Sequence, residues 1–167
     1  RGLAANEVRD QLMSAGVPSD RADLAARLAV GNRIPPANVG GEDFAALRDF
    51  VERFIDSALG DREDDYWVLL EELGGRPDKQ RMEGFFGLCS AYLRDLFLID
   101  LQRPAQVANV DRKERLTAWS SRLNTGRLND VAQSLDAAFD SQRHNVSPQL
   151  LLAELWHQLR RSGTVRH

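Results

Sequence analysis

Few residues of this 167-residue chain have the type and spacing that catalysis or metal binding requires. His144 and His157 are the only histidines outside the last residues of the chain, and the single cysteine, Cys89, lies far from both in sequence. No pair of them has the short spacing of a zinc site, and Cys89 falls on an apolar face, where a free thiol usually packs as a small hydrophobic group. A single cysteine excludes an intrachain disulfide and suits a reducing compartment. We therefore expect no metal, no cofactor and no catalytic thiol.

The acidic residues also lack a catalytic arrangement. The pairs Asp64–Asp65 and Glu71–Glu72 could suggest metal or acid–base chemistry. A di-metal site of this kind needs two Glu-x-x-His pairs, and the sequence has one such spacing, at Glu154 and His157, far along the chain from these acids. A solvated helix face therefore explains the acidic pairs better. The sequence contains no G-x-x-x-x-G-K-[ST] loop to cradle a nucleotide phosphate. We predict that this chain is not itself an enzyme.

Basic side chains gather around one predicted helix, where they could meet phosphate groups. The cluster comprises Arg112, Lys113, Arg115, Arg122 and Arg127. Acidic neighbours (Asp111, Glu114 and Asp130) dilute it, and the net charge of −3 argues against extensive coating by nucleic acid. The candidate weak phosphate contacts are Arg112, Lys113 and Arg115. The alternative is that these charges pair with neighbouring turns or complement the ends of helices.

Helices must position these side chains, because apolar residues recur every three or four positions along most of the chain. The stretch 82–101 is apolar on almost every side of a helix, which indicates a helix buried among others. Its charged residues argue against a membrane span. Weaker stripes predict further helices at 6–15, 19–30, 43–59, 61–73, 111–125, 128–139 and 148–161. No run alternates with the period of a strand, so we predict an all-α protein built as an antiparallel helical bundle.

Capping residues indicate where two of the later helices begin. Asp111 and Glu114 are spaced as a variant of the capping box, which predicts that Asp111 opens a helix. Ser147 is a candidate N-cap for the last helix, with Pro148 at its first position. Beyond this helix we expect the chain to fray from Ser162 onward.

Three motifs in the second half of the chain resemble those of a known family. They are Tyr-Leu-Arg-Asp-Leu at 92–96, Asn-Val-Asp at 109–111 and Asn-Val-Ser-Pro-Gln-Leu-Leu-Leu-Ala-Glu at 145–154. In order and spacing they look like the C-terminal collar domain of bacterial DNA polymerase III clamp-loader subunits. The delta-prime subunits are the most similar, and the gamma/tau subunits come next. Residues 24–37 are similar to the end of the small helical lid domain of AAA+ ATPases.

The resemblance implies a short AAA+ lid remnant followed by a collar-type helical bundle. Residues 1–38 would form the two-helix lid remnant, 39–162 the oligomerisation domain and 163–167 a frayed tail. The segment 32–41, with two prolines and two glycines, would be the hinge or strut between the two parts. Pro36 stands where family members with active nucleotide sites carry a sensing arginine, which fits the delta-prime subunits, because these generally do not hydrolyse ATP.

The implied function is assembly. The collar would join the other clamp-loader subunits, delta and gamma/tau, in a pentameric loader that places the sliding clamp on primed DNA in the bacterial cytoplasm, at the replisome. Clamp and primer–template DNA would be reached only through the whole complex, whose parent holoenzyme is a DNA-directed DNA polymerase, and no membrane would be involved. Because the chain lacks an initiator methionine, we expect it to be part of a longer protein.

The last predicted helix is the candidate for subunit contact, because Trp and Arg are enriched at interface hot spots. The candidate interface residues are Leu151, Leu155, Trp156, Leu159 and Arg160. Two alternatives are the collar of a gamma/tau ATPase subunit and an unrelated helical bundle that binds a ligand between its helices. The ligand pocket would then lie near Tyr66, Trp67 and Tyr92.

Overall fold

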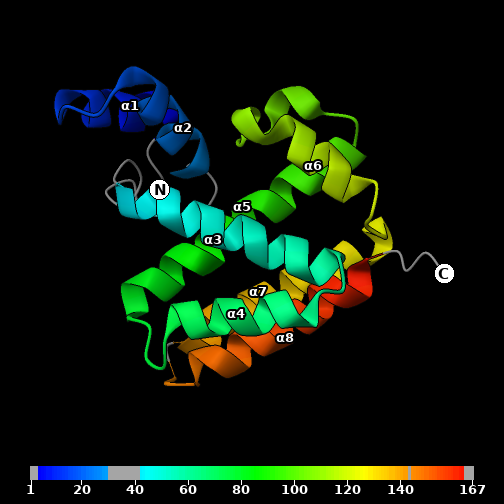
Figure 1. Ribbon diagram of the computed structural model, residues 1–167. Helices are drawn as coiled ribbons and strands as arrows, with labels where there is room; N and C mark the ends of the chain where they lie inside the picture. The colour runs from blue at the N-terminus through cyan, green and yellow to red at the C-terminus, as the bar shows by residue number, and fades with distance from the viewer. Residues whose placement is uncertain (1–3, 30–41, 143, 164–167) are drawn as a thin grey trace.

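The structure, a computed structural model, describes residues 4–29, 42–142 and 144–163. Within these ranges the chain forms eight α-helices, a few short 3-10 helices and no strand (Figure 1), which confirms the predicted all-α class. The helices are α1 (Ala5–Ser14), α2 (Ser19–Ala29), α3 (Glu42–Leu59), α4 (Glu63–Leu73), α5 (Lys79–Asp100), α6 (Lys113–Ser120), α7 (Leu128–Gln142) and α8 (Pro148–Ser162). The expected hinge at 32–41, with Pro36, lies outside the described residues.

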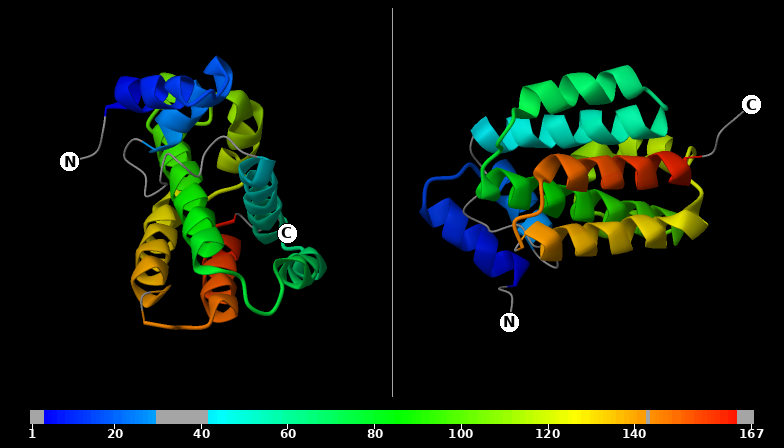
Figure 2. Two further views of the ribbon diagram at one scale, coloured as in Figure 1. Left: turned by 90° about the vertical axis from the view of Figure 1, so that its left-hand side faces the viewer. Right: turned by 90° about the horizontal axis from the view of Figure 1, so that it is seen from below.

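Helix α5 runs through the middle of the bundle, as its all-round apolar sequence predicts (Figure 2). It packs against α3, α6 and α7. The helix begins at Lys79, where the Asp78 carboxylate caps it by accepting a hydrogen bond from the Arg81 N–H at 2.7 Å. Gly84 lets α3 come close, since a Cβ at this position would lie 2.8 Å from Cδ2 of Leu47. None of the described helices is long and apolar enough to cross a membrane.

Helices α7 and α8 pack against one another and against α5 and α3 respectively. Trp156 of α8 is fully buried, stacks on Tyr66 of α4 with ring centroids 4.9 Å apart, and donates its indole N–H to Ser57 Oγ of α3 at 2.9 Å. Helix α4 packs on α3 and lies at an outer edge of the bundle (Figures 1 and 2). One side of α4 therefore faces the core and the other faces outward.

Helices α1 and α2 form a hairpin at one end of the bundle (Figure 1). Gly16, with a φ of 90°, turns the chain between them, and the N–H of Val17 donates back to the Leu12 carbonyl at 3.0 Å. Ala25 and Leu28 of α2 are buried in the same apolar core as α3 and α5. The hairpin is thus packed onto the bundle through its second helix.

The predicted cap at Asp111 is wrong, whereas the cap at Ser147, with Pro148 opening the helix, is confirmed in its position but not in its hydrogen bond. Asp111 does not cap α6, which begins at Lys113 after a 3-10 turn, because its carboxylate pairs with Arg48 of α3 instead. Ser147 does precede α8, but its hydroxyl donates to Gln149 Oε1 at 2.9 Å and makes no hydrogen bond to the helix backbone. In each case the capping residue bonds to another side chain, Arg48 or Gln149, instead of to the backbone N–H groups at the start of the helix.

The expected fraying from Ser162 is also wrong for the part of the tail that the structure describes. Ser162 ends α8 and is fully buried, and its carbonyl accepts the Asn124 N–H at 2.7 Å. Gly163 forms an isolated bridge with Leu123. This pairing also explains why α6 stops at Ser120, short of the predicted helix end at 125. Residues 164–167 lie outside the described residues.

Candidate functional site at the junction of α3, α5 and α6

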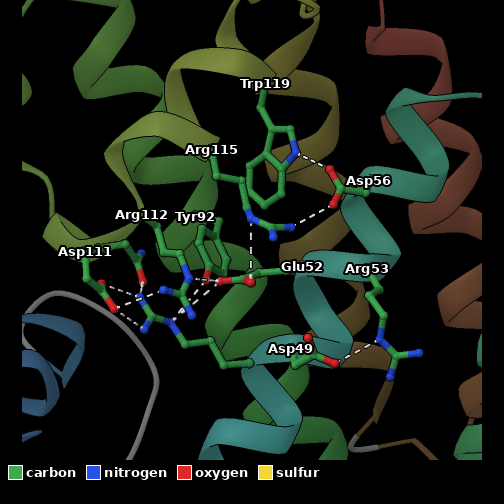
Figure 3. A network of polar contacts seen from close by, with 11 residues as sticks. Asp49, Glu52, Arg53, Asp56, Tyr92, Asp111, Arg112, Arg115 and Trp119 are labelled. Carbon is green, nitrogen blue, oxygen red and sulfur yellow. Dashed lines mark hydrogen bonds and ion pairs between the residues drawn. The ribbon is translucent and has the colours of Figure 1, made fainter.

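A network of buried polar side chains joins α3, α5 and α6 (Figure 3). Arg48 of α3 lies in it with 5% of its surface exposed. Its guanidinium donates to both carboxylate oxygens of Asp111 at 2.7 Å and to Oδ1 of Asn109 at 2.8 Å, and its Nε donates to the Tyr92 hydroxyl at 3.1 Å. This planar, two-pronged contact is the geometry in which arginine binds a carboxylate most strongly.

Charge and burial set the protonation of these groups. Burial disfavours the charge of Arg48, but the hydrogen bonds and electrostatic attraction of Asp111 and Tyr92 together outweigh it, and the pKa of Arg48 is raised. The hydrogen bond from Arg48 in turn lowers the pKa of Asp111. Burial raises the pKa of Tyr92, so the phenol stays protonated and donates a hydrogen bond to Glu52. Arginine and carboxylate are thus charged and the phenol is neutral near pH 7.

Glu52, one turn after Arg48, is a second buried centre with 3% of its surface exposed. Its carboxylate accepts from the Tyr92 hydroxyl and from Nε of Arg112 at 2.7 Å, and it lies 3.7 Å from Nε of Arg115 (Figure 3). A buried carboxylate is tolerated only when its charge is compensated and its lone pairs are hydrogen-bonded. Tyr92 of α5 and Arg112 of the turn before α6 supply the hydrogen bonds, and Arg115 of α6 adds a second positive charge.

Asp56, one turn further along α3, extends the same stripe. It accepts the indole N–H of Trp119 at 2.6 Å and the Arg115 guanidinium at 2.7 Å. Arg48, Glu52 and Asp56 are spaced by four residues and so project from one face of α3. Side chains from α6 and from the turn before it therefore meet α3 at three successive turns.

Asp95 of α5 secures the chain just before α6. It is fully buried, and its carboxylate accepts the backbone N–H groups of Ala108 at 2.8 Å and Asn109 at 2.9 Å. It also accepts the side-chain amide of Asn109 at 2.7 Å, while Oδ1 of the same amide accepts from Arg48. Asp95 belongs to the motif at 92–96, whereas Asn109 and Asp111 belong to the motif at 109–111. Two of the three motifs that carry the family resemblance thus meet at this junction.

The hydrogen bonds of this junction hold α3, α5 and α6 in position relative to one another. A general base must reach a proton on a substrate, and Glu52 and Asp95 are buried behind their hydrogen-bond donors. Among the described residues there is no group of three or more side chains that could hold a metal ion. The Cys89 thiol lies in the apolar core, where burial raises its pKa and keeps it from acting as a nucleophile.

The predicted phosphate contacts are largely committed to this network. Arg112 and Arg115 are bonded to Glu52 and Asp56 but keep side-chain exposures of 38% and 39%, so their contact with phosphate stays a prediction. Their charges are drawn inward because the buried carboxylates of α3 need compensation. Lys113 is exposed on the rim of a shallow hollow of about 510 Å³ that Asp111 and the two arginines also line.

The predicted interface residues of the last helix lie mostly in the core. Leu155, Trp156 and Leu159 are buried within the chain, which corrects the expectation that they contact a neighbouring subunit. Leu151 is half-buried against the same core. Arg160 is exposed, pairs with Asp61 at 2.6 Å and lies over the Trp156 ring. Helices α3 and α7 already pack against α8, so the burial predicted between subunits occurs inside one chain.

The residues of the alternative ligand pocket do not gather at one place. Tyr66 stacks on Trp156, Tyr92 packs edge-on against Trp119 with ring centroids 5.4 Å apart, and Trp67 is exposed on the outer side of α4. A different hollow of about 250 Å³ lies where the start of α5 meets the turn between α7 and α8. Its apolar lining includes Met82, Phe86, Val146 and Leu151.

The key residues Arg48, Glu52 and Asp95 were not predicted as a site. Asp95 carried a signal, because a lone acid inside an otherwise apolar stretch requires a partner when that stretch is buried. Comparison with known proteins finds no family model, no curated protein and no solved structure that matches the chain.

Proposed function

We propose that the chain is the subunit-assembling C-terminal region of a bacterial clamp-loader subunit of the delta-prime type. The meeting of Asp95 with Asn109, and of Asn109 and Asp111 with Arg48, carries the proposal. Two motifs that resemble those of the collar family in sequence thus lie in one hydrogen-bonded network, which joins α5, the turn before α6 and α3. A chain that commits its buried charges to a rigid junction suits a mechanical function.

In this function the bundle is a rigid collar segment. It would hold AAA+ modules of neighbouring subunits in a circle, so that nucleotide binding in one can organise a surface that grips the sliding clamp and primed DNA. Stable association of this kind typically buries about 800 Å² on each partner. The fragment itself would bind no nucleotide, and its setting would be the replisome in the bacterial cytoplasm.

Size-exclusion chromatography with light scattering tests the proposal. The chain is run alone and mixed with the collar domains of delta and gamma/tau subunits from the same loader. We expect a hetero-complex of fixed stoichiometry. A chain that stays monomeric with every partner contradicts the proposal. A P-loop in the sequence upstream of this region would instead favour the gamma/tau subunit as its parent.

A ligand-binding bundle is the second candidate, and the apolar hollow beside Met82, Phe86 and Leu151 is the observation that favours it. Ligand sites in helical bundles are typically apolar hollows between helices with a few polar groups at the rim. An environment-sensitive apolar dye would bind there, and Leu151→Trp would displace it. If the dye binds in this way and the chain does not assemble with the delta and gamma/tau collar domains, the ligand-binding bundle becomes the better proposal.

A further inference from the structure

We propose that the outward side of α4 is a docking surface for a helix with an apolar centre and basic ends. Tyr66, Leu69 and Leu73 turn toward the core and are buried. Four residues on the opposite side follow the spacing i, i+3, i+4 and i+7, which places them in one line along the helix. This α4 stripe consists of Asp64, Trp67, Val68 and Glu71.

The centre of the α4 stripe is apolar and exposed. Trp67 is 55% exposed and Val68 is 59% exposed. The Trp67 ring lies against Tyr66 with centroids 5.4 Å apart, so it is supported from beneath and has fewer conformations to lose on binding. Exposed tryptophan beside a second apolar side chain is typical of interface centres, where a few residues carry most of the binding energy.

The ends of the α4 stripe determine which partner fits. The flanking acids of the helix are used within the chain, since Asp65 pairs with Arg62 and Glu72 with Arg53, each at 2.6 Å. Asp64 and Glu71 form no ion pair with any of the described residues. A partner with arginine or lysine at both ends of an apolar patch would therefore be complementary. Arginine could also contact the face of Trp67.

The pattern of the stripe also indicates the shape of the partner. The stripe has an acidic residue at each end and two apolar residues between them, so its pattern is the same in both directions. A partner helix with basic residues at i and i+7 and apolar residues at i+3 and i+4 therefore fits in either orientation. That the partner helix belongs to a neighbouring clamp-loader subunit rests on the proposed function, whereas the surface itself does not. The α4 stripe takes the place of the buried face of α8 as the contact surface.

The test uses two synthetic helical peptides and the intact chain. One peptide carries Arg at i and i+7 and Leu at i+3 and i+4, and its control carries Glu in place of Arg. Trp67 is the natural reporter, because Trp119 and Trp156 are buried. We expect the basic peptide to shift Trp67 emission to the blue and to bind at least about tenfold more tightly than the acidic one, with affinity falling in about 1 M salt.

Charge-reversal variants locate the contact. Asp64→Lys with Glu71→Lys should weaken binding of the basic peptide at least about fivefold, whereas the matched pair Asp100→Lys with Glu114→Lys, elsewhere on the surface, should not. Should Asp64→Lys disturb the start of α4, Glu71→Lys alone still tests the site, because lysine is favourable near a helix C-terminus.

Three results would overturn the inference: no binding of the basic peptide, equal binding of both peptides, or equal loss in the control pair. A blue shift that grows with protein concentration alone would assign the stripe to a second copy of the chain instead. If the subunits assemble but the Lys variants assemble equally well, the inference fails and the proposed function stands. If the basic peptide binds but no subunit does, the proposed function fails instead.

Discussion

The two sides of α3 hold their neighbours by different means. Toward α6, Asp56 receives the indole N–H of the buried Trp119, and toward α8, Ser57 receives that of the buried Trp156. Around Trp119 the contacts are charged and directional, and α6 is only eight residues long. Trp156 packs on the ring of Tyr66 and makes its hydrogen bond to a neutral hydroxyl, while the exposed Arg160 lies over its ring.

The difference shows what each kind of contact contributes. An eight-residue helix is marginal on its own, so α6 depends on hydrogen bonds with fixed directions to set its position against α3. On the α8 side apolar area and shape supply the stability. A missing partner should therefore cost more on the α6 side, because it leaves a buried charge uncompensated.

The largest expected effect is that of Arg48→Met. The variant loses the buried guanidinium that binds Asp111 and Asn109, and we expect a loss of about 3–5 kcal/mol in the free energy of unfolding. The matched control is Arg53→Met, whose exposed pair with Glu72 should be worth less than about 1 kcal/mol. Guanidinium unfolding followed by circular dichroism measures both. Equal effects would show that the network does not stabilise the fold.

Adjacent residues on α3 allow the two sides to be compared directly. Asp56→Ala leaves the Trp119 N–H and the Arg115 guanidinium without their acceptor, and we expect a cost of about 2–3 kcal/mol. Ser57→Ala removes one neutral acceptor from Trp156 and should cost about 1 kcal/mol. The same unfolding experiment ranks them, and the reverse order would contradict the account.

A smaller effect is expected in acid. Hydrogen bonding to Arg48 lowers the pKa of Asp111 in the folded state below its ordinary value of 3.8. The stability that Asp111 contributes is therefore complete above the unfolded pKa and is lost as the pH falls through the folded one. Because this carboxylate is partly solvated, the loss should be at most about 1 kcal/mol. Stability measured against pH should fall less steeply below pH 3.8 in Asp111→Asn, and parallel curves would contradict this.

Apolar periodicity predicted the helices because the stripe that a helix buries is a local property of its sequence. The all-round apolar pattern of α5 predicted its central place in the same way. Partners far apart in sequence were beyond such reasoning. Asp111 has the spacing of a cap, and only the fold brings Arg48, 63 residues away, close enough to compete.

The candidate interface could not be decided from sequence for a related reason. Tryptophan and leucine at helical spacing are typical of both cores and interfaces, and whether Trp156 is covered depends on where Tyr66 and Ser57 lie. Sequence could not predict that Trp67 is exposed either, since the neighbouring aromatic residue, Tyr66, is buried. The acidic pairs on α4 were correctly expected on a solvated face. The sequence did not predict that Glu72 forms an ion pair with Arg53 while Glu71 does not.

Hydrogen exchange with mass spectrometry tests the central claim most directly, namely that the α6 junction is closed within the chain while α4 is open to a partner. Exchange is compared for the chain alone and for the chain mixed with its partner subunits. We expect backbone amides of α4 (Glu63–Leu73) to exchange more slowly in the mixture, with little change over 109–120. Slowing confined to 109–120, or none at α4, would contradict the account.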